Sequence, residues 1–106
     1  MTTSVPRHHG SGPLPVIAPR GDFDFQSLPP LQAQIDAAVA AHGGVILDAS
    51  GITFADSMFL VLIISTHQAT DLRIAAPSSR LARLFSIRGL DTILHIYPTL
   101  DAARIT

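Results

Sequence analysis

The chain has 106 residues, of which 47% are hydrophobic and 14% charged, and its formal net charge at pH 7 is -1. That length suits a single domain with one core, and so apolar a composition excludes a chain that is disordered over most of its length. The seven basic residues form no cluster, which argues against nucleic acid as a partner, and the absence of cysteine excludes disulfides, thiolate metal sites and cysteine nucleophiles.

The sequence also lacks a segment that would cross a membrane or direct export. Its longest apolar run, residues 58–64, is far shorter than the roughly 20 residues that span a bilayer. The N-terminus shows neither the basic start nor the apolar stretch of a secretory signal. We therefore expect a cytoplasmic protein without membrane insertion.

The N-terminal residues 1–13 are rich in Ser, Gly and Pro and predict a flexible segment or a short edge strand. The folded domain is expected over residues 14–106. Its first strand is predicted over residues 14–20, where Pro15 and Pro19 share one side of the strand. Because proline has no N–H to donate, that side would face an unpaired edge.

Signals of a helix follow the first strand. Ser27 predicts the N-cap, and Pro29 and Pro30 fall in the first turn, where their missing N–H groups have no helical partner. Apolar residues then recur at helical spacing until Gly43, which predicts the end of the helix. The uninterrupted apolar run 45–47 that comes next is typical of a parallel strand covered on both faces.

The second half of the chain continues to alternate between helical and strand patterns. A connector over residues 48–56 leads to an apolar stretch whose length favours a helix. The expected elements from there are a helix over 58–68, a strand over 72–76, a helix from Ser78 or Ser79 to Gly89, a strand over 93–97 and a short helix ending near Arg104. This order predicts an α/β domain with a mixed, mostly parallel sheet of four or five strands and about four helices.

The Asp56-Ser57 pair is the most informative feature, because a buried strand leads to it and an apolar helix follows it. If Ser57 lies at or near the N-cap, its hydroxyl accepts hydrogen bonds from the first turn, where the helix end carries partial positive charge. A phosphate there would add a charge of about -1.5 to -2 beside Asp56 without altering the fold. On spacing alone, a serine that only caps the helix is the more common case, because capping serines are frequent and Asp-Ser pairs are weak signals.

Three separated motifs resemble the STAS domain, the family of bacterial anti-sigma factor antagonists. Residues 21–24 (Gly-Asp-Phe-Asp) resemble its Gly-acid-apolar-Asp element, and residues 48–60 resemble its strand-loop-Asp-Ser-helix signature. Residues 76–85 with 89–91 resemble its third helix and the following turn. The resemblance extends over roughly residues 14–104 in the family's order, and three motifs together are far more specific than one.

The resemblance implies a phosphorylation-switched domain of bacterial signalling and transcription regulation, and neither an enzyme nor a cofactor-dependent protein. It would bind an anti-sigma factor, itself a serine kinase, and so free a sigma factor, as a monomer or weak homodimer. Ser57 aligns with the phosphoacceptor, Asp24 with a loop aspartate near it, and Asp56 with the residue before it. The partner-binding residues are then expected to be Asp22, Asp24, Asp56, Ser57, Met58 and Phe59.

Two departures from the family pattern bear on this role. Met58 and Phe59 stand where most members have Ser or Ala and then Gly. Their bulk would either obstruct a kinase or provide a more selective apolar contact. The link over residues 67–71 is also short and lacks the usual glycine, which predicts a trimmed helix.

Two other functions fit parts of the sequence. One is a structural STAS subunit of a larger cytoplasmic or transporter-associated complex, without phosphorylation. The other is a hydrolase, but Ser57 and His67 lie ten residues apart on one predicted helix, roughly 15 Å, and no Gly-x-Ser-x-Gly elbow is present. The histidines also form no i, i+4 ligand pair, so no metal site is predicted among His8, His9, His42, His67 and His95.

Overall fold

The computed structural model describes residues 13–105, so the predicted N-terminal segment 1–13 lies, apart from Pro13, outside the described residues. Six strands and four helices alternate along this part of the chain, together with one short 3-10 turn. The strands are β1 (Val16–Ile17), β2 (Gly21–Phe23), β3 (Gly44–Asp48), β4 (Ile52–Ala55), β5 (Asp71–Ala75) and β6 (His95–Tyr97). The helices are α1 (Leu28–His42), α2 (Ser57–Ala69), α3 (Ser79–Ile87) and α4 (Leu100–Arg104), and the 3-10 turn is η1 (Leu90–Thr92).

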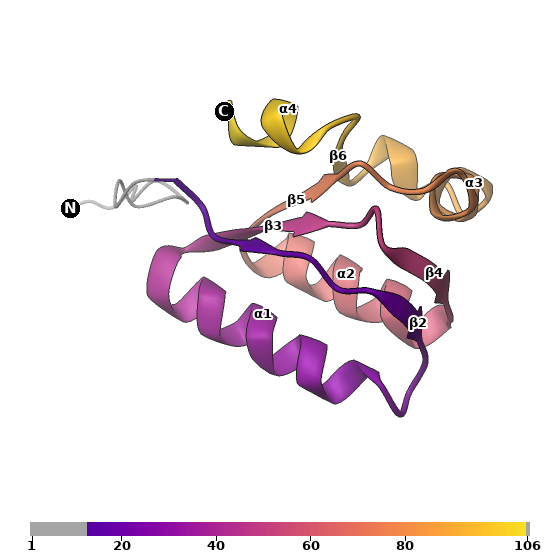
Figure 1. Ribbon diagram of the computed structural model, residues 1–106, viewed down its shortest axis with the longest axis horizontal. Helices are drawn as coiled ribbons and strands as arrows, with labels where there is room; N and C mark the ends of the chain where they lie inside the picture. Colours follow the sequence, from indigo (N-terminus) through magenta and orange to yellow (C-terminus); the bar gives the residue numbers. More distant parts are fainter. Residues whose placement is uncertain (1–12, 106) are drawn as a thin grey trace.

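The main sheet has four strands in the order β1-β3-β5-β6, and every neighbouring pair is parallel. Strands β2 and β4 form a separate parallel pair. In Figure 1, α1 and α2 lie against one face of the main sheet, α4 covers the other face, and α3 lies beyond it next to β4. The predicted α/β class with a mostly parallel sheet is therefore confirmed.

The core lies between the main sheet and helices α1 and α2. The uninterrupted run 45–47 is buried in β3, which pairs on both sides as predicted for a central strand. Alternate residues of β3 and β5 face α1 and α2, and the largest fully buried side chains of this layer include Ile35, Leu47, Phe59, Ile63 and Ile74. Burial of large apolar side chains of this kind contributes about 1.5–3 kcal/mol each.

Helix α1 begins and ends where the sequence predicts, but its N-cap differs. Pro29 and Pro30 occupy the first turn, and Gly43 ends the helix at φ 78°, a left-handed conformation that glycine adopts without strain. Ser27 stands at the N-cap position and its hydroxyl makes no capping bond. It accepts the N–H of Asp24 at 3.0 Å instead, so it braces the preceding loop.

The single strand predicted over residues 14–20 is wrong, because this segment holds only β1 and the chain then changes sheets. Strand β2 begins at Gly21, where the backbone has φ 97° and the N–H donates to the carbonyl of Gly51 at 2.8 Å. A side chain at Gly51 would meet the backbone of Pro19 at 3.1 Å, so the two loops cross in close contact. The connector predicted over 48–56 likewise contains β4, which the sequence analysis missed.

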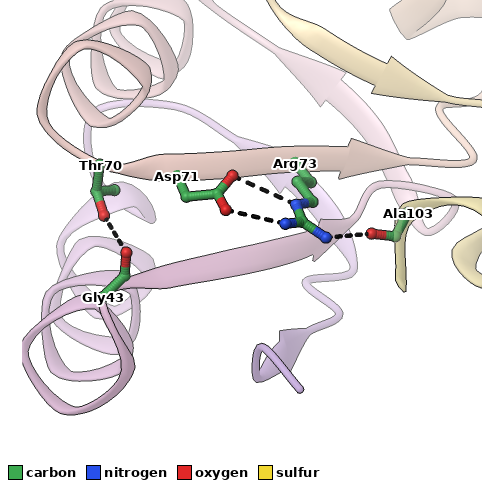
Figure 2. A network of polar contacts seen from close by, with 5 residues as sticks. All are labelled: Gly43, Thr70, Asp71, Arg73 and Ala103. Atoms are coloured by element: carbon green, nitrogen blue, oxygen red, sulfur yellow. Dashed lines mark hydrogen bonds and ion pairs between the residues drawn. The ribbon is translucent and has the colours of Figure 1, made fainter. Parts of the chain in front are cut away.

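The opposite face of the main sheet carries a small polar network that holds α4 (Figure 2). The guanidinium of Arg73 pairs with Asp71, its Nη2 lying 3.0 Å from Oδ2, and its Nη1 donates to the carbonyl of Ala103 at 2.8 Å. Both side chains are buried. Because the buried charges are paired and the Ala103 carbonyl is satisfied, the network ties the last helix to β5.

The end of α2 corrects the prediction of a trimmed helix. The helix runs to Ala69, and Thr70 ends it in an extended conformation where a glycine was expected. The Thr70 hydroxyl donates to the carbonyl of Gly43 at 2.8 Å, a bond that Figure 2 also shows. The helix keeps its length because this side chain, and not a left-handed glycine, turns the chain into β5.

Candidate functional site

Ser57 is the first residue of α2, and its side chain is exposed. Asp56 holds the N-cap position, where its Oδ1 accepts the N–H of Met58 at 2.9 Å and that of Phe59 at 3.1 Å. The expectation that the Ser57 hydroxyl caps the helix is therefore wrong. Within residues 13–105 no hydrogen bond engages this hydroxyl, which lies at the positively polarised end of a 13-residue helix.

Phe59 does not cover Ser57 and cannot contact a partner. Its side chain has 0% exposure and points into the core, where its ring centroid lies 6.2 Å from that of Phe23. The prediction of Phe59 as a partner-binding residue is corrected by this burial. Met58 is 50% exposed, so of these two residues only Met58 adds apolar bulk to the surface next to the serine.

Asp24 lies in the turn between β2 and α1, and the turn holds its carboxylate ionised. Oδ1 accepts the N–H of Gln26 at 2.9 Å and the N–H and hydroxyl of Ser27 at 3.1 and 3.2 Å. The Ser27 N–H is the main cause of a lowered pKa at Asp24, followed by the Gln26 N–H. These donors stabilise the charged form, so the carboxylate is a fixed negative charge at neutral pH.

Asp22 is exposed on β2 and is tied to β4 by its side chain. Its Oδ1 accepts the hydroxyl of Thr53 at 2.5 Å. The main-chain pairing of the two strands places Phe23 opposite Ala55. Asp22 therefore strengthens the contact between the strands that end at the site.

The β2–β4 pair brings the predicted site residues together. Asp24 directly follows β2, and Asp56 with Ser57 directly follows β4, so all three emerge at the same end of a parallel pair. The N–H of Asp56 donates to the carbonyl of Phe23 at 3.1 Å, which fixes this juxtaposition. In Figure 1 the start of α2 lies beside the ends of β2 and β4.

Two exposed apolar side chains that the sequence analysis missed belong to the same elements, β4 and α2. Phe54 on β4 is 49% exposed, and Val61 lies one helical turn after Met58 and is 52% exposed. The i, i+3 spacing places Met58 and Val61 on the same side of α2. The spacing was present in the sequence, but the continuous apolar run 58–64 hides which of its residues face outward.

The histidines do not assemble a catalytic or metal site in the part of the chain that the structure describes. Ser57 and His67 lie near opposite ends of α2, and Ser57 has no hydrogen-bonded base among residues 13–105. The His67 ring packs edge-on against that of His95, with centroids 5.2 Å apart. No group of three potential metal-ligating side chains occurs within residues 13–105.

The helices were compared with the length and apolarity of a membrane span. Within residues 13–105, no helix combines the length and the apolarity that crossing a bilayer requires.

Comparison with known proteins agrees with this architecture. An anti-sigma factor antagonist from Mycobacterium paratuberculosis is 29% identical, with a TM-score of 0.74 over 83% of this chain and 80% of that one. The unphosphorylated form of the anti-sigma factor antagonist SpoIIAA has a TM-score of 0.66 at 21% identity, covering 83% of this chain and 82% of that one. A Thermotoga maritima protein shares the fold at 18% identity and a TM-score of 0.74, covering 83% and 81%.

Sequence comparison gives the family. No curated protein sequence matches the chain significantly. The sequence profile of the STAS domain, in contrast, matches residues 5–103, nearly the whole chain. The chain belongs to the STAS domain family.

Proposed function

We propose that this protein is an anti-sigma factor antagonist that binds an anti-sigma factor through the start of α2 and is released when Ser57 is phosphorylated. The observation that carries the proposal is the exposed Ser57 at the first residue of α2, directly after Asp56 and at the same end of the β2–β4 pair as the Asp24 turn. The similarity to the Mycobacterium paratuberculosis antagonist supports the same class of partner. The role is one of protein binding in the cytoplasm, without catalysis by this chain.

Phosphorylation would act through charge and leave the fold intact. The N–H groups of the first turn are bonded to Asp56 and not to Ser57, so modifying the serine removes no cap. A phosphate would add about -1.5 to -2 charge next to the carboxylates of Asp24 and Asp56. A partner that fits the surface with these charges alone loses affinity, because the new negative charge is repelled or must be desolvated at the interface.

The partner contact combines this switchable charge with an apolar area. Phe54 on β4 and Met58 and Val61 on α2 are half-exposed, and large apolar side chains at the surface are typical of binding sites. Met58 does not cover Ser57, which is exposed, and is therefore assigned as an apolar contact that selects the partner. Of the two bulky residues that follow Ser57, a kinase has to accommodate only Met58, since Phe59 faces the core.

Incubation with a serine kinase of the anti-sigma type and ATP tests the proposal, with intact mass as the readout. We expect one added phosphate on the wild type and none on Ser57→Ala. Ser65→Ala is the matched control, because Ser65 is an exposed serine two turns along the same helix. Phosphate retained in Ser57→Ala would contradict the assignment of the acceptor.

A second candidate is a structural STAS subunit that binds its partner permanently, without phosphorylation. The half-exposed Phe54, Met58 and Val61 favour it, because a lasting complex would keep them covered. Co-purification from the native source distinguishes the two functions. A stable complex containing unmodified protein, together with no phosphate transfer in the kinase assay, would show that the protein is a structural subunit and not a phosphorylation-switched antagonist.

A further inference from the structure

A surface hollow of about 260 Å³ lies between β4 and α3, and Ser57 is not among the residues that line it. We call it the β4–α3 hollow. Its lining is almost entirely carbon, and the side chains that matter here are Phe54, Leu81, Leu84, Ile87, Arg80 and Arg83. Its volume is near the lower end for sites that bind small molecules, which are mostly apolar with a few convergent polar groups.

Two arginines of α3 border the hollow, and because the lining is almost entirely carbon they contribute to it mainly with the carbon atoms of their side chains. Arg80 and Arg83 line it and also line an adjoining hollow with Ser79, at the first turns of α3. Within residues 13–105 the ion pairs are Arg73–Asp71 and Arg104–Asp101, so neither Arg80 nor Arg83 has a carboxylate partner there. No carboxylate lines either hollow in the described part of the chain.

Apolar side chains on the two sides of the hollow are exposed. Ile87 is 71% exposed and Phe54 is 49% exposed, on opposite sides of the hollow. Positions 80, 83, 84 and 87 follow the i, i+3, i+4, i+7 spacing, so one side of α3 presents both the arginines and the apolar residues to β4. Two unpaired cations next to an uncovered apolar surface suit a ligand that is negatively charged at one end and apolar at the other.

We propose that the β4–α3 hollow binds a small organic carboxylate with an alkyl body. The alkyl body lies against Phe54, Leu84 and Ile87, and the carboxylate pairs with Arg80 and Arg83, whose planar guanidinium groups match it. The nearest acid of β2 is Asp22, and its carboxylate is already engaged by the Thr53 hydroxyl. This carboxylate adjoins the lining residue Thr53, so the carboxylate of the ligand is placed at Arg80 and Arg83 and only its alkyl body lies against β4.

Titration of the full chain, with isotope-labelled methyl groups observed by NMR, tests the proposal. We expect octanoate to shift the methyl signals of Leu84 and Ile87 saturably. Acetate has the carboxylate without the long alkyl chain, and 1-octanol has the alkyl chain without the negative charge. Each should therefore bind at least tenfold more weakly than octanoate. Equal binding of octanoate and 1-octanol, or no saturable shift with octanoate, would overturn the proposal.

Variants separate the two ends of the hollow. The double variant Arg80→Gln with Arg83→Gln should weaken octanoate binding at least tenfold, and Ile87→Ser should weaken it without affecting acetate. Arg104→Gln is the matched control, because Arg104 is an exposed arginine on α4 whose Asp101 contact is long, 4.0 Å. An equal loss in Arg104→Gln would show that net charge alone attracts the anion and would refute the site.

Anionic phospholipid vesicles distinguish a free carboxylate from a membrane surface. Binding to vesicles without binding to octanoate would overturn the proposal in favour of a lipid surface. None of these measurements needs the partner or the kinase. Their failure therefore leaves the assignment of Ser57 untouched, and a failed kinase assay leaves the hollow untouched.

Discussion

The backbone N–H of Asp56 donates a hydrogen bond of 3.1 Å to the carbonyl of Phe23. This bond joins the end of β4 to the end of β2, so the turn carrying Asp24 and the start of α2 carrying Ser57 are held together by main-chain atoms. Side-chain substitutions at the surface leave the bond in place. The charge at Ser57, whose hydroxyl makes no hydrogen bond within residues 13–105, can therefore be changed in experiments while this main-chain bond stays in place.

Replacing Ser57 should affect partner affinity and leave stability almost unchanged. We expect Ser57→Asp to weaken capture of the anti-sigma factor at least tenfold, about 1.4 kcal/mol, because it adds charge beside two carboxylates. Ser57→Ala should bind like the wild type, since the hydroxyl makes no bond within residues 13–105. Calorimetric titration measures the affinities, and thermal melts should agree within about 0.5 kcal/mol.

Asp24→Lys tests the same surface from the other segment and should also weaken capture at least tenfold. Unchanged affinity in both Ser57→Asp and Asp24→Lys would show that the partner binds elsewhere.

Asp56 caps α2, so removing its carboxylate should lower the free energy of unfolding. Asp56→Ala removes the acceptor of two N–H groups and should cost about 1 kcal/mol of unfolding free energy. Asp56→Asn keeps an acceptor oxygen and should remain close to the wild type, while removing one charge from the site. Urea unfolding measures both. Equal losses in the two variants would mean that the charge, and not the cap, stabilises the helix.

Phe59 and Met58 should behave as opposites although they are neighbours. Phe59→Ala empties a fully buried position next to Phe23 and should cost about 3–5 kcal/mol. Met58→Ala alters a half-exposed side chain and should change stability by less than about 0.5 kcal/mol while weakening partner capture. Unfolding curves and titration together test the pair. A Phe59→Ala variant that is as stable as the wild type but binds the partner more weakly would show that Phe59 contacts the partner.

Local signals in the sequence were sufficient for much of the fold. Gly43 ends α1 in a left-handed conformation, and Ser78 caps α3 by accepting the N–H of Leu81 at 3.3 Å. Each of these features depends on residues within one or two turns of each other. The buried run of β3 was equally readable, because a parallel strand covered on both faces needs no alternation.

The errors concern features that depend on distant contacts. Strand β4 forms because β2, which lies about thirty residues earlier, pairs with it through the crossing at Gly21 and Gly51. The inward direction of Phe59 depends on Phe23 in the same way. A continuous apolar run carries no period that would separate the inner from the outer side. Which of the proposed site residues face outward could therefore not be predicted from the sequence.

Replacing only Arg73 of the buried Arg73–Asp71 ion pair should destabilise the protein more than replacing both residues. Arg73→Met leaves the Asp71 carboxylate buried without a partner and the Ala103 carbonyl without its donor, and should cost about 3–5 kcal/mol. The double variant Asp71→Asn with Arg73→Met removes the stranded charge and should recover part of that loss. Urea unfolding measures both variants. No recovery in the double variant would assign the whole loss to the bond with α4.

Asp24 should make stability depend on pH in acid. Its folded pKa lies below the ordinary value of about 3.9, chiefly because the Ser27 N–H stabilises the carboxylate. A lowered folded pKa contributes stability that is fully present above the unfolded value and is lost as the pH falls through the folded value. We expect Asp24→Asn to have a lower urea midpoint than the wild type near neutral pH, and the gap to close as the pH falls below about 3.9. NMR titration of the Asp24 carboxyl carbon gives an independent check, with a midpoint below that value. A gap of constant size from neutral pH to the acid limit of the fold would show that the turn depends on the shape of the side chain and not on its charge.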